Sequence, residues 1–569
     1  MAVNAHIGYP VTVYDLLNMH IRGNLVMHID MVNIHNYKCY YGKFSINFNK
    51  GVNILVGDNG SGKSTILEAT HLALSGILHG RYLKNELSQY LFNSKAVSEY
   101  LKNVNNGGNA SLPEICIEVF FNKNSIPKFQ GTGNKDRSDS CGISFKIEFD
   151  DTYLDEYSEL INSGDKLNTL PIEYYKVSWT SFDRDSVTSR SIPIKSVLID
   201  SASNKYQNGS DVYISRIIKN ELEDKEKVEL SQAYRKMKDS FTEEEAVKKI
   251  NEKIDEKSKV EGKHLSISVD LSTQNSWESS LMTYLGDIPF HQIGKGSQCI
   301  IKTNLALGHK KTKEASLLLI EEPENHLSHS KLNYLLKEIT NGSTDKQVII
   351  STHSSFVANK LGLENLLLLN EHKITRFIDL SKDTFDFFKK LPGYQTLRLI
   401  LCKKAVLVEG DSDELVFQKA YMVANDGRLP IEDGVDVISV KLTFKRFLEI
   451  ANKINKKVAV ITDNDGDYAT KVSKKYKEYF KHDHISIFAD KRNNLNTLEP
   501  QFVDANKDVL SKLCNELELD DEKYNTVEKL SKKLQKQKTI WALKVFESKA
   551  KFISYPQYIV NAVRWCDGK

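Results

Sequence analysis

The feature that most constrains this chain is a glycine-rich loop set between an apolar run and a helical run. Residues 57–64 read GDNGSGKS, which fits the pattern GxxxxGK[ST]. The run 52–56 predicts a buried strand before the loop, and 65–78 predicts a helix after it. Glycines let such a loop curl so that backbone N–H groups face phosphate oxygens, and the helix start adds partial positive charge.

This strand–loop–helix unit predicts a nucleotide-phosphate site. Lys63 would neutralise the β- and γ-phosphates, and the Ser64 hydroxyl would hold Mg²⁺. The predicted nucleotide-binding residues of the loop are Asn59, Gly60, Gly62, Lys63, Ser64 and Thr65.

Three later segments have the residue types that complete an ATP site. An apolar run at 317–320 ends in Glu321, placed to lie beside the metal ion, and Glu322, placed to polarise the attacking water. His353 follows the predicted strand 348–350, where it could sense the γ-phosphate. The segment GKGSQ at 294–298 leads into a helix, and the backbone amides of Gly296 and Ser297 could grip a phosphate there.

A second group of acids points to a second site. Glu409 and Asp413 follow the predicted strand 405–408, and Asp463 and Asp465 follow the predicted strand 458–461. Parallel strands of one sheet end at the same edge, so these acids can converge there. Clustered carboxylates bind Mg²⁺ or Mn²⁺, and two such ions can activate water against a phosphodiester. Either cluster alone is as well explained by an ordinary acidic turn.

Periodicity predicts an α/β protein of several domains. We expect a leader at 1–27, an N-terminal lobe at 28–205, a helical insertion at 206–263 serving as an arm or dimerisation element, a C-terminal lobe at 264–395 and a separate parallel α/β domain at 396–569. The strands expected besides those above lie at 28–34 with its antiparallel neighbour 44–48, and at 115–121, 144–149, 174–179, 196–199, 265–271, 437–440 and 484–488.

The order of the loop, the helical insertion, GKGSQ, the two glutamates and His353 resembles the split head of ABC-type ATPases of the DNA-repair and SMC kind. The resemblance implies that the signature segment of one subunit closes over nucleotide bound to another, so a homodimer or higher homo-oligomer is expected. GKGSQ stands where transporters have LSGGQ, and Glu321 where an aspartate is usual, and either departure could slow hydrolysis. Gln89 is the best Q-loop candidate.

The acidic pattern is similar to the Toprim domain, and the whole chain resembles the OLD-family (overcoming lysogenisation defect) nucleases. The resemblance assigns Glu409, Asp413, Asp463, Asp465 and Glu499 to two metal sites. It assigns a late lysine in a K-x-x-x-A helix, here Lys538 before Ala542, to charge stabilisation at the scissile phosphate, with Lys536, Lys544 and Lys549 nearby. Relatives usually carry glycine where this chain reads VKLTF at 440–444.

The resemblance implies an ATP-regulated, Mg²⁺- or Mn²⁺-dependent DNA endonuclease or nickase. Members often act in phage defence, alone or with a partner such as a helicase in Gabija systems or a reverse transcriptase with its RNA–DNA in some retrons. Two alternatives stay open: an ATP-dependent sensor or clamp that grips nucleic acid without cutting, and a topoisomerase-like or primase-like enzyme, for which no nucleophilic tyrosine motif stands out.

Composition limits the partners. The chain has 569 residues and a formal net charge of only +3, so a DNA surface must be a local patch. Lysines around 471–481 and 529–551 are as consistent with backbone-directed DNA binding as with a solvated face. Seven scattered cysteines, no signal-peptide pattern and no apolar run of roughly 20 residues predict a cytoplasmic protein without a membrane segment.

Overall fold

The computed structural model describes residues 27–568 except 80, 109–110, 123–125, 164–165, 201–205, 208–209, 212–221, 258–266, 268–281, 309–314, 342–345, 371, 377–379 and 391–393. The expected leader, up to residue 26, and all but residue 267 of the expected strand 265–271 lie outside the described residues. The chain divides into two compact units, one of residues 1–54 and 62–352, the other of residues 55–61 and 353–569.

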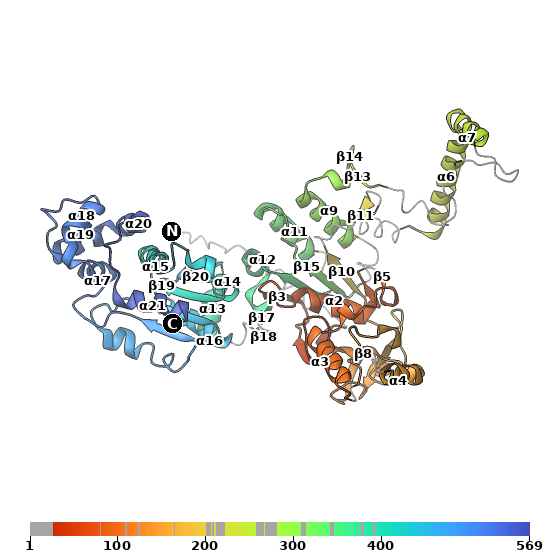
Figure 1. Ribbon diagram of the computed structural model, residues 1–569, viewed down its shortest axis with the longest axis horizontal. Coiled ribbons are helices and arrows are strands. Elements are labelled where there is room, and N and C mark those ends of the chain that lie inside the picture. Colours follow the sequence, from red (N-terminus) through yellow and green to blue (C-terminus); the bar gives the residue numbers. More distant parts are fainter. Residues whose placement is uncertain are drawn as a thin grey trace, which may run out of the picture. The chain divides into compact units, whose positions relative to one another are not determined.

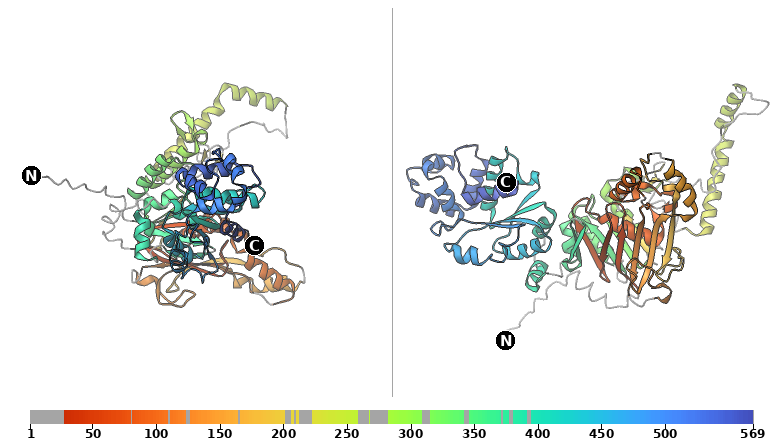
Figure 2. Two further views of the ribbon diagram at one scale, coloured as in Figure 1. Left: turned by 90° about the vertical axis from the view of Figure 1, so that its left-hand side faces the viewer. Right: turned by 60° about the horizontal axis from the view of Figure 1, so that its bottom comes forward.

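The first unit contains an antiparallel sheet. β1 (Ile29–His35) pairs antiparallel with β2 (Lys43–Asn47), as expected from the alternation of apolar residues. The sheet continues in the order β2-β1-β6-β8-β7, with β9 also paired to β8. Its other strands are β6 (Ile115–Phe121), β7 (Gln130–Gly131), β8 (Ser140–Phe149) and β9 (Tyr175–Ser181). The right-hand view of Figure 2 shows these red to orange strands side by side.

A second set of strands carries the nucleotide motifs. β10 (Ser196–Asp200), β15 (Leu317–Glu321) and β16 (Gln347–Thr352) run parallel, and β3 (Val52–Gly57) lies next to β16. Their apolar residues are fully or almost fully buried at the centre, as parallel strands covered on both faces require.

Helix α2 (Lys63–Ser75) follows the loop and packs against these strands (Figure 1). It ends three residues earlier than expected, because Gly76 takes a left-handed conformation with φ 69° and donates to the carbonyl of Leu72. Outside the helical insertion, the described α-helices of this unit also include α3 (Ser94–Asn105), α4 (Leu154–Asn162), α9 (Lys295–Gly308) and α11 (His329–Asn341).

The expected helical insertion is a helix pair, α6 (Asp224–Glu243) and α7 (Glu245–Lys257), which pack on each other (Figure 1). The insertion was expected to start at residue 206, but its first described residues are not helical. β11 (Tyr206–Gln207) and β12 (Ser210–Asp211) form a short antiparallel pair at this point. Further two-residue hairpins are β4 (Ile77–Leu78) with β5 (Arg81–Tyr82), and β13 (Tyr284–Leu285) with β14 (Ile288–Pro289).

The second unit contains a four-stranded parallel sheet in the order β20-β19-β21-β22. Its strands are β19 (Lys404–Val408), β20 (Val435–Ser439), β21 (Lys457–Ile461) and β22 (Ile485–Phe488), each within a few residues of the expected position. The helices that follow Val408 are α15 (Asp411–Ala424), α16 (Phe444–Lys453), α17 (Leu498–Ala505), α18 (Leu510–Glu516), α19 (Val527–Gln537), α20 (Thr539–Glu547) and α21 (Gln557–Asp567).

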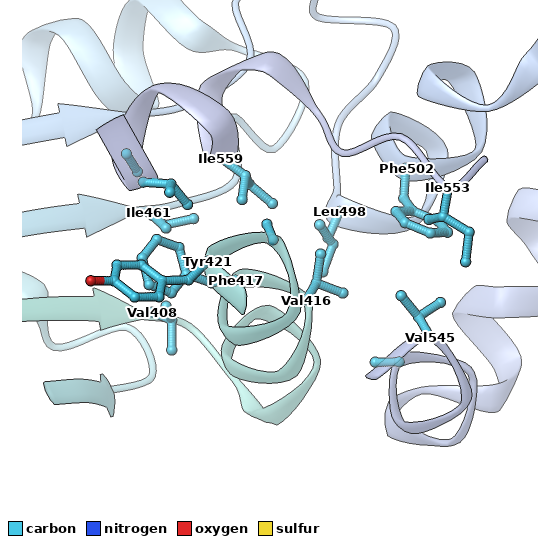
Figure 3. Close-up of a cluster of buried hydrophobic side chains, with 14 of the residues drawn as sticks. Val408, Val416, Phe417, Tyr421, Ile461, Leu498, Phe502, Val545, Ile553 and Ile559 are labelled. Carbon is cyan, nitrogen blue, oxygen red and sulfur yellow. The ribbon is translucent and has the colours of Figure 1, made fainter. Parts of the chain in front are cut away.

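Side chains from this sheet and its helices form one apolar core. Val408 on β19 and Ile461 on β21 lie against Phe417 on α15, and Phe502 on α17 extends the core toward α20 and α21 (Figure 3). Burying such side chains removes apolar surface from water at about 25 cal/mol per Å², which fixes the helices on the sheet and holds its acidic edge in place.

Before this sheet the second unit contains β17 (Leu366–Asn370) paired antiparallel with β18 (Lys373–Arg376), and helices α12 (Ser355–Leu361), α13 (Lys382–Lys390) and α14 (Tyr394–Leu401). The apolar run of β17 was not among the expected strands. No helix within the described ranges is long and apolar enough to cross a membrane.

Candidate functional site

The glycines of the phosphate loop are required by the backbone. Gly60 and Gly62 have φ of 77° and 100°, which side-chain-bearing residues rarely adopt. A Cβ on Gly62 would lie 2.4 Å from the hydroxyl oxygen of Tyr40, and that hydroxyl donates to the Gly62 carbonyl over 3.2 Å. Lys63 begins α2 and is 4% exposed, so its charge sits at the helix N-terminus below the loop.

Ser64 and Glu321 meet in the first unit. The Ser64 hydroxyl hydrogen-bonds to the Glu321 carboxylate. Burial, above all, raises the pKa of Glu321, and the neighbouring charges of Asp200 and Glu322 raise it further. A hydroxyl and a buried carboxylate in contact are oxygen ligands of the kind Mg²⁺ takes in nucleotide sites, so these residues fit the cation that accompanies ATP.

Glu322 sits in a constrained turn after β15. Its φ is 39°, and its N–H donates to the carbonyl of Ser351 at the end of β16 over 3.0 Å. Its carboxylate accepts from Asn325 over 3.1 Å. His353 follows β16 directly and is exposed. The sequence therefore predicted correctly that these residues stand at strand ends.

The segment expected to act as a signature packs closely on the turn after Glu322. Gly296 lies in the first turn of α9, where a Cβ would lie 2.5 Å from the carbonyl oxygen of His326. Ser297 is the next residue of that turn, and the Gln298 side chain donates to the carbonyls of Phe290 and Ile293 over 2.9 and 2.8 Å. Gln298 thus holds the start of α9.

Other predicted nucleotide residues have local partners. The Gln89 carboxamide accepts from the N–H of Leu170 over 3.2 Å, which gives the Q-loop assignment no support. Thr65 lies beside the Cys39 thiol at 3.5 Å. Asn59 is exposed at the tip of the loop.

In the second unit, Glu409 and the DxD acids converge at the carboxyl edge of the parallel sheet. One oxygen of Glu409, Oε1, accepts from the Thr462 hydroxyl over 2.7 Å and from the N–H of Asp463 over 3.1 Å. Neighbouring strands β19 and β21 therefore present their acids side by side.

Asp413 is buried and Asp463 is half-buried within this group. Burial, together with the charges of Glu409 and Glu499, raises the pKa of Asp413 to about 7. Burial, followed by Asp413, Glu409, Glu499 and Asp465, raises the pKa of Asp463 to about 9. Each of the other predicted acids therefore acts electrostatically on Asp413 or Asp463, and we call the five together the acidic cluster.

Asp465 and Glu499 form the outer part of the acidic cluster. Asp465 has φ of 48°, donates its N–H to the carbonyl of Asn496 over 3.1 Å, and is 4.0 Å from the Lys471 ammonium. Glu499 stands in the first turn of α17 and accepts from the Thr497 hydroxyl over 3.0 Å.

The acidic cluster suits divalent cations. The Asp463 oxygen Oδ1 is buried without a hydrogen-bond partner, and a buried anion without compensation is costly. In the part of the chain that the structure describes, no three His, Cys, Asp or Glu side chains are arranged closely enough to hold an ion. Carboxylates near one another repel, and a cation bound to their oxygens would offset that repulsion.

Asn464, between the two DxD acids, was not predicted to have a role. It is fully buried, and its amide donates to the carbonyls of Asp490, Arg492 and Leu495 over 2.9, 3.0 and 3.1 Å. Its oxygen accepts from the N–H of Gly466 over 2.8 Å. Asn464 thereby fixes the turn that carries both acids, and only long-range contacts reveal this.

The structure places the predicted lysine at a junction between two helices. Lys538 is exposed with φ of 47° and separates α19 from α20, so it caps the helix of Ala542 instead of lying within it. Lys475, which sequence reasoning did not single out, has its ammonium in the field of Glu409 and Asp465. Within the stretch 440–444, where glycine is usual in the family that the chain resembles, Lys441 adopts φ of 53°, a conformation that favours glycine.

These two sites define a class of protein in which a phosphate-loop ATPase domain is joined to an acidic, parallel α/β domain. An AAA domain profile matches residues 32–266, and the profile "Overcoming lysogenization defect protein-like, TOPRIM domain" matches residues 400–465. The chain thus joins an ATPase head to an OLD-like Toprim domain, as expected from its motifs.

Similar proteins match parts of the chain. It is 30% identical over 128 residues, 21% of this chain, to "Structural maintenance of chromosomes protein 3 homolog" of Plasmodium falciparum (isolate 3D7). It is 39% identical over 66 residues, 12% of this chain, to "DNA replication and repair protein RecF" of Tropheryma whipplei (strain TW08/27). The matches span only 10% and 17% of those two proteins.

Similar solved structures include the SMC head domain from Thermotoga maritima, at 13% identity and TM-score 0.27 over 60% of this chain and 94% of that one. The recombination mediator protein RecF with ATP matches at 11% identity and TM-score 0.30, over 62% of this chain and 98% of that one.

Proposed function

We propose that this chain is an ATP-binding and ATP-hydrolysing, divalent-metal-dependent DNA endonuclease or nickase whose cutting is governed by nucleotide state. The observation that carries the proposal is the acidic cluster, in which Glu409 binds the backbone of Asp463 at the carboxyl edge of the parallel sheet. A surface that only grips nucleic acid has no use for buried carboxylates, because they repel phosphate.

In this proposal, Glu409, Asp413, Asp463, Asp465 and Glu499 hold Mg²⁺ or Mn²⁺. Bound there, the cations supply charge stabilisation at the phosphodiester and a more acidic water. The chain's own part is to orient the oxygens: Thr462 holds the Glu409 carboxylate, and Asn464 holds the turn between Asp463 and Asp465. Hydrolysis joins the water oxygen to phosphorus and releases the sugar oxygen as a hydroxyl.

The ATPase head supplies the regulation. Lys63 and Ser64 bind the phosphates and Mg²⁺, with Glu321 beside the cation and Glu322 next to the attacking water. His353 senses the γ-phosphate, and Gly296 and Ser297 of one subunit close over the nucleotide of another in a homodimer or larger assembly. ATP can shift the Toprim site between two conformational states only if it binds the open and closed heads with different free energies.

We further propose a role in cytoplasmic anti-phage defence, alone or with a partner that supplies a helicase or a reverse transcriptase with its RNA–DNA. The support is the pairing of an ATPase head with an OLD-like Toprim domain in one chain.

The test is cleavage of supercoiled plasmid by the full-length chain with Mg²⁺ or Mn²⁺, with and without ATP. Glu409→Ala and Asp463→Ala should each abolish cutting, and Asp426→Ala, an acid outside the cluster, should leave it unchanged. Lys63→Ala should remove the response to ATP. Cutting that survives both acidic substitutions would refute the metal-site assignment, and an equal ATP response in Lys63→Ala would refute the coupling.

A further inference from the structure

A hollow of about 640 Å³ in the second unit is lined mainly by positive charge. One aromatic ring and one acid, Phe480 and Glu478, line it together with Lys445, Lys474, Lys475, Lys477 and Lys481. We call this feature the basic hollow. Five ammonium groups around one concavity repel one another, so the arrangement favours a polyanion as its occupant.

The basic hollow is built on segments that start at the sheet edge of the acidic cluster. Most of its lining comes from the connection between β21 and β22, which starts at the DxD acids, and Lys445 comes from α16 after β20. Strands β20 and β21 both flank β19, and Glu409 follows that strand. The segments that line the basic hollow therefore continue from the strands on either side of Glu409.

Aromatic anchors hold the connection in place. Tyr476 is fully buried, and its ring stands edge-on to that of Phe444 at 6.4 Å between centroids. The hydroxyl of the largely buried Tyr479 donates to the carbonyl of Lys445 over 3.4 Å. The lysines thus project from a packed segment, so the charged lining is held in position beside the site.

The charges link the basic hollow to the acidic cluster. The half-buried Lys475 interacts electrostatically with Glu409 and Asp465, and Lys471, one turn earlier, is 4.0 Å from Asp465. A phosphate resting on Lys475 would therefore lie within the electrostatic range of these carboxylates, and Lys471 extends the positive charge from the basic hollow toward Asp465.

Phosphate binding by the lysines does not account for the exposed ring of Phe480. Its side chain is 50% exposed at the rim of a cationic surface, where a large apolar ring gains nothing from water. An exposed ring among lysines is the combination that binds unpaired strands, with phosphates on the ammonium groups and a base stacked on the ring. Bases inside a duplex have no free face to offer.

We propose that the basic hollow binds single-stranded nucleic acid, with the backbone on its lysines and one base on Phe480, and so leads an unpaired strand to the acidic cluster. The cleavage step rests on the proposed nuclease function, whereas the binding step does not.

The test is binding of a fluorescein-labelled 20-nucleotide oligo(dT) and a 20-base-pair duplex to the full-length chain in EDTA, followed by fluorescence anisotropy. Phe480→Ala should weaken oligo(dT) binding about tenfold and leave duplex binding unchanged, because only the stacked base is lost. Phe480→Trp should retain oligo(dT) binding. Tyr82→Ala, which removes another exposed ring, 69% exposed on β5, is the matched control and should change neither affinity.

Salt dependence tests the backbone contacts. Lys474→Gln combined with Lys477→Gln should reduce the slope of log affinity for oligo(dT) against log salt by about 1.4, since each phosphate contact on a single strand contributes about 0.7. Lys507→Gln combined with Lys512→Gln, two exposed lysines of the same unit outside both predicted lysine groups, is the charge-matched control and should leave the slope unchanged.

The outcomes separate this inference from the nuclease proposal. If Phe480→Ala binds oligo(dT) like the wild type, or loses duplex binding to the same extent, the single-strand assignment is wrong even if plasmid cleavage depends on Glu409. If the wild type never cleaves nucleic acid but binds oligo(dT) through Phe480, the nuclease proposal fails and the basic hollow stands.

Discussion

The N–H of Asp463 donates to the Glu409 carboxylate over 3.1 Å, so the ends of two neighbouring parallel strands are joined through the acids themselves. The Thr462 hydroxyl donates to the same oxygen over 2.7 Å. Because both donors come from the residues after β21, the orientation of Glu409, which follows β19, is set by the strand that carries the DxD acids.

Thr462→Val should weaken metal binding without unfolding the domain. Valine keeps the shape of threonine but cannot hold the Glu409 carboxylate, and losing a residue that orients a ligand typically costs 10–100-fold in metal affinity. We expect the Mn²⁺ concentration for half-maximal cleavage to rise about tenfold or more. Ser439→Ala is the control, since that hydroxyl donates to the backbone carbonyl of Glu409 over 3.3 Å. Equal metal requirements in both variants would show that the carboxylate needs no such support.

Gly296→Ala should impair the ATPase head, whereas Gly294→Ala should not. A Cβ on Gly296 would lie 2.5 Å from the carbonyl oxygen of His326, and one on Gly294 would meet nothing within 4 Å. Relieving the first contact requires a backbone shift costing about 1–3 kcal/mol, and it moves α9 away from the turn after Glu322. We expect ATP turnover to fall about tenfold in Gly296→Ala and to stay unchanged in Gly294→Ala. Normal turnover in both would exclude a role for this close approach.

Lys441→Gly should stabilise the Toprim domain. Lys441 has φ of 53°, which costs a residue with a Cβ about 1 kcal/mol. Glycine removes this strain but gains freedom in the unfolded chain, so the free energy of unfolding should rise by about 0.5 kcal/mol. Leu442→Gly is the control: Leu442 is 73% exposed and is not among the residues with positive φ, so that change should only destabilise. Chemical denaturation measures the change in the free energy of unfolding of each variant. A loss of stability in Lys441→Gly would contradict the inferred backbone strain at Lys441.

The sequence predicted those parts of the sites that depend on local pattern. The loop at 57–64 and the acids after β19 and β21 follow from short motifs placed at strand ends, and parallel strands bring such ends together. Asn464 escaped prediction because its importance comes from three carbonyls 26 to 31 residues away in the chain. Lys538 was assigned by its resemblance to a K-x-x-x-A helix, and that pattern does not reveal the break between α19 and α20.

The charges around Lys475 and the backbone conformation of Lys441 could not be predicted from the sequence either. Lys475 reaches the field of Glu409 only because the connection after β21 folds back on Phe444 through Tyr476. The positive φ of Lys441 depends on the turn between β20 and α16, and neither a lysine nor its neighbours signals such a turn.

The stability of the ATPase head should fall as the pH drops below about 6.5, through His71. This side chain lies on α2 behind the phosphate loop, with its Nδ1 2.9 Å from the Ser196 hydroxyl, and burial lowers its pKa to about 4. The folded chain therefore keeps His71 neutral, while the unfolded chain takes up a proton below its ordinary pKa of 6.5. The stabilisation is complete above pH 6.5 and is lost as the pH falls toward 4, with roughly 1–2 kcal/mol gone by pH 5.

His71→Asn removes the titrating group, so its midpoint of thermal unfolding should change less between pH 7.5 and pH 5 than that of the wild type. His291→Asn, an exposed histidine of the same unit, should retain the wild-type pH dependence. A pH dependence of His71→Asn as steep as the wild type would assign the acid sensitivity to other groups.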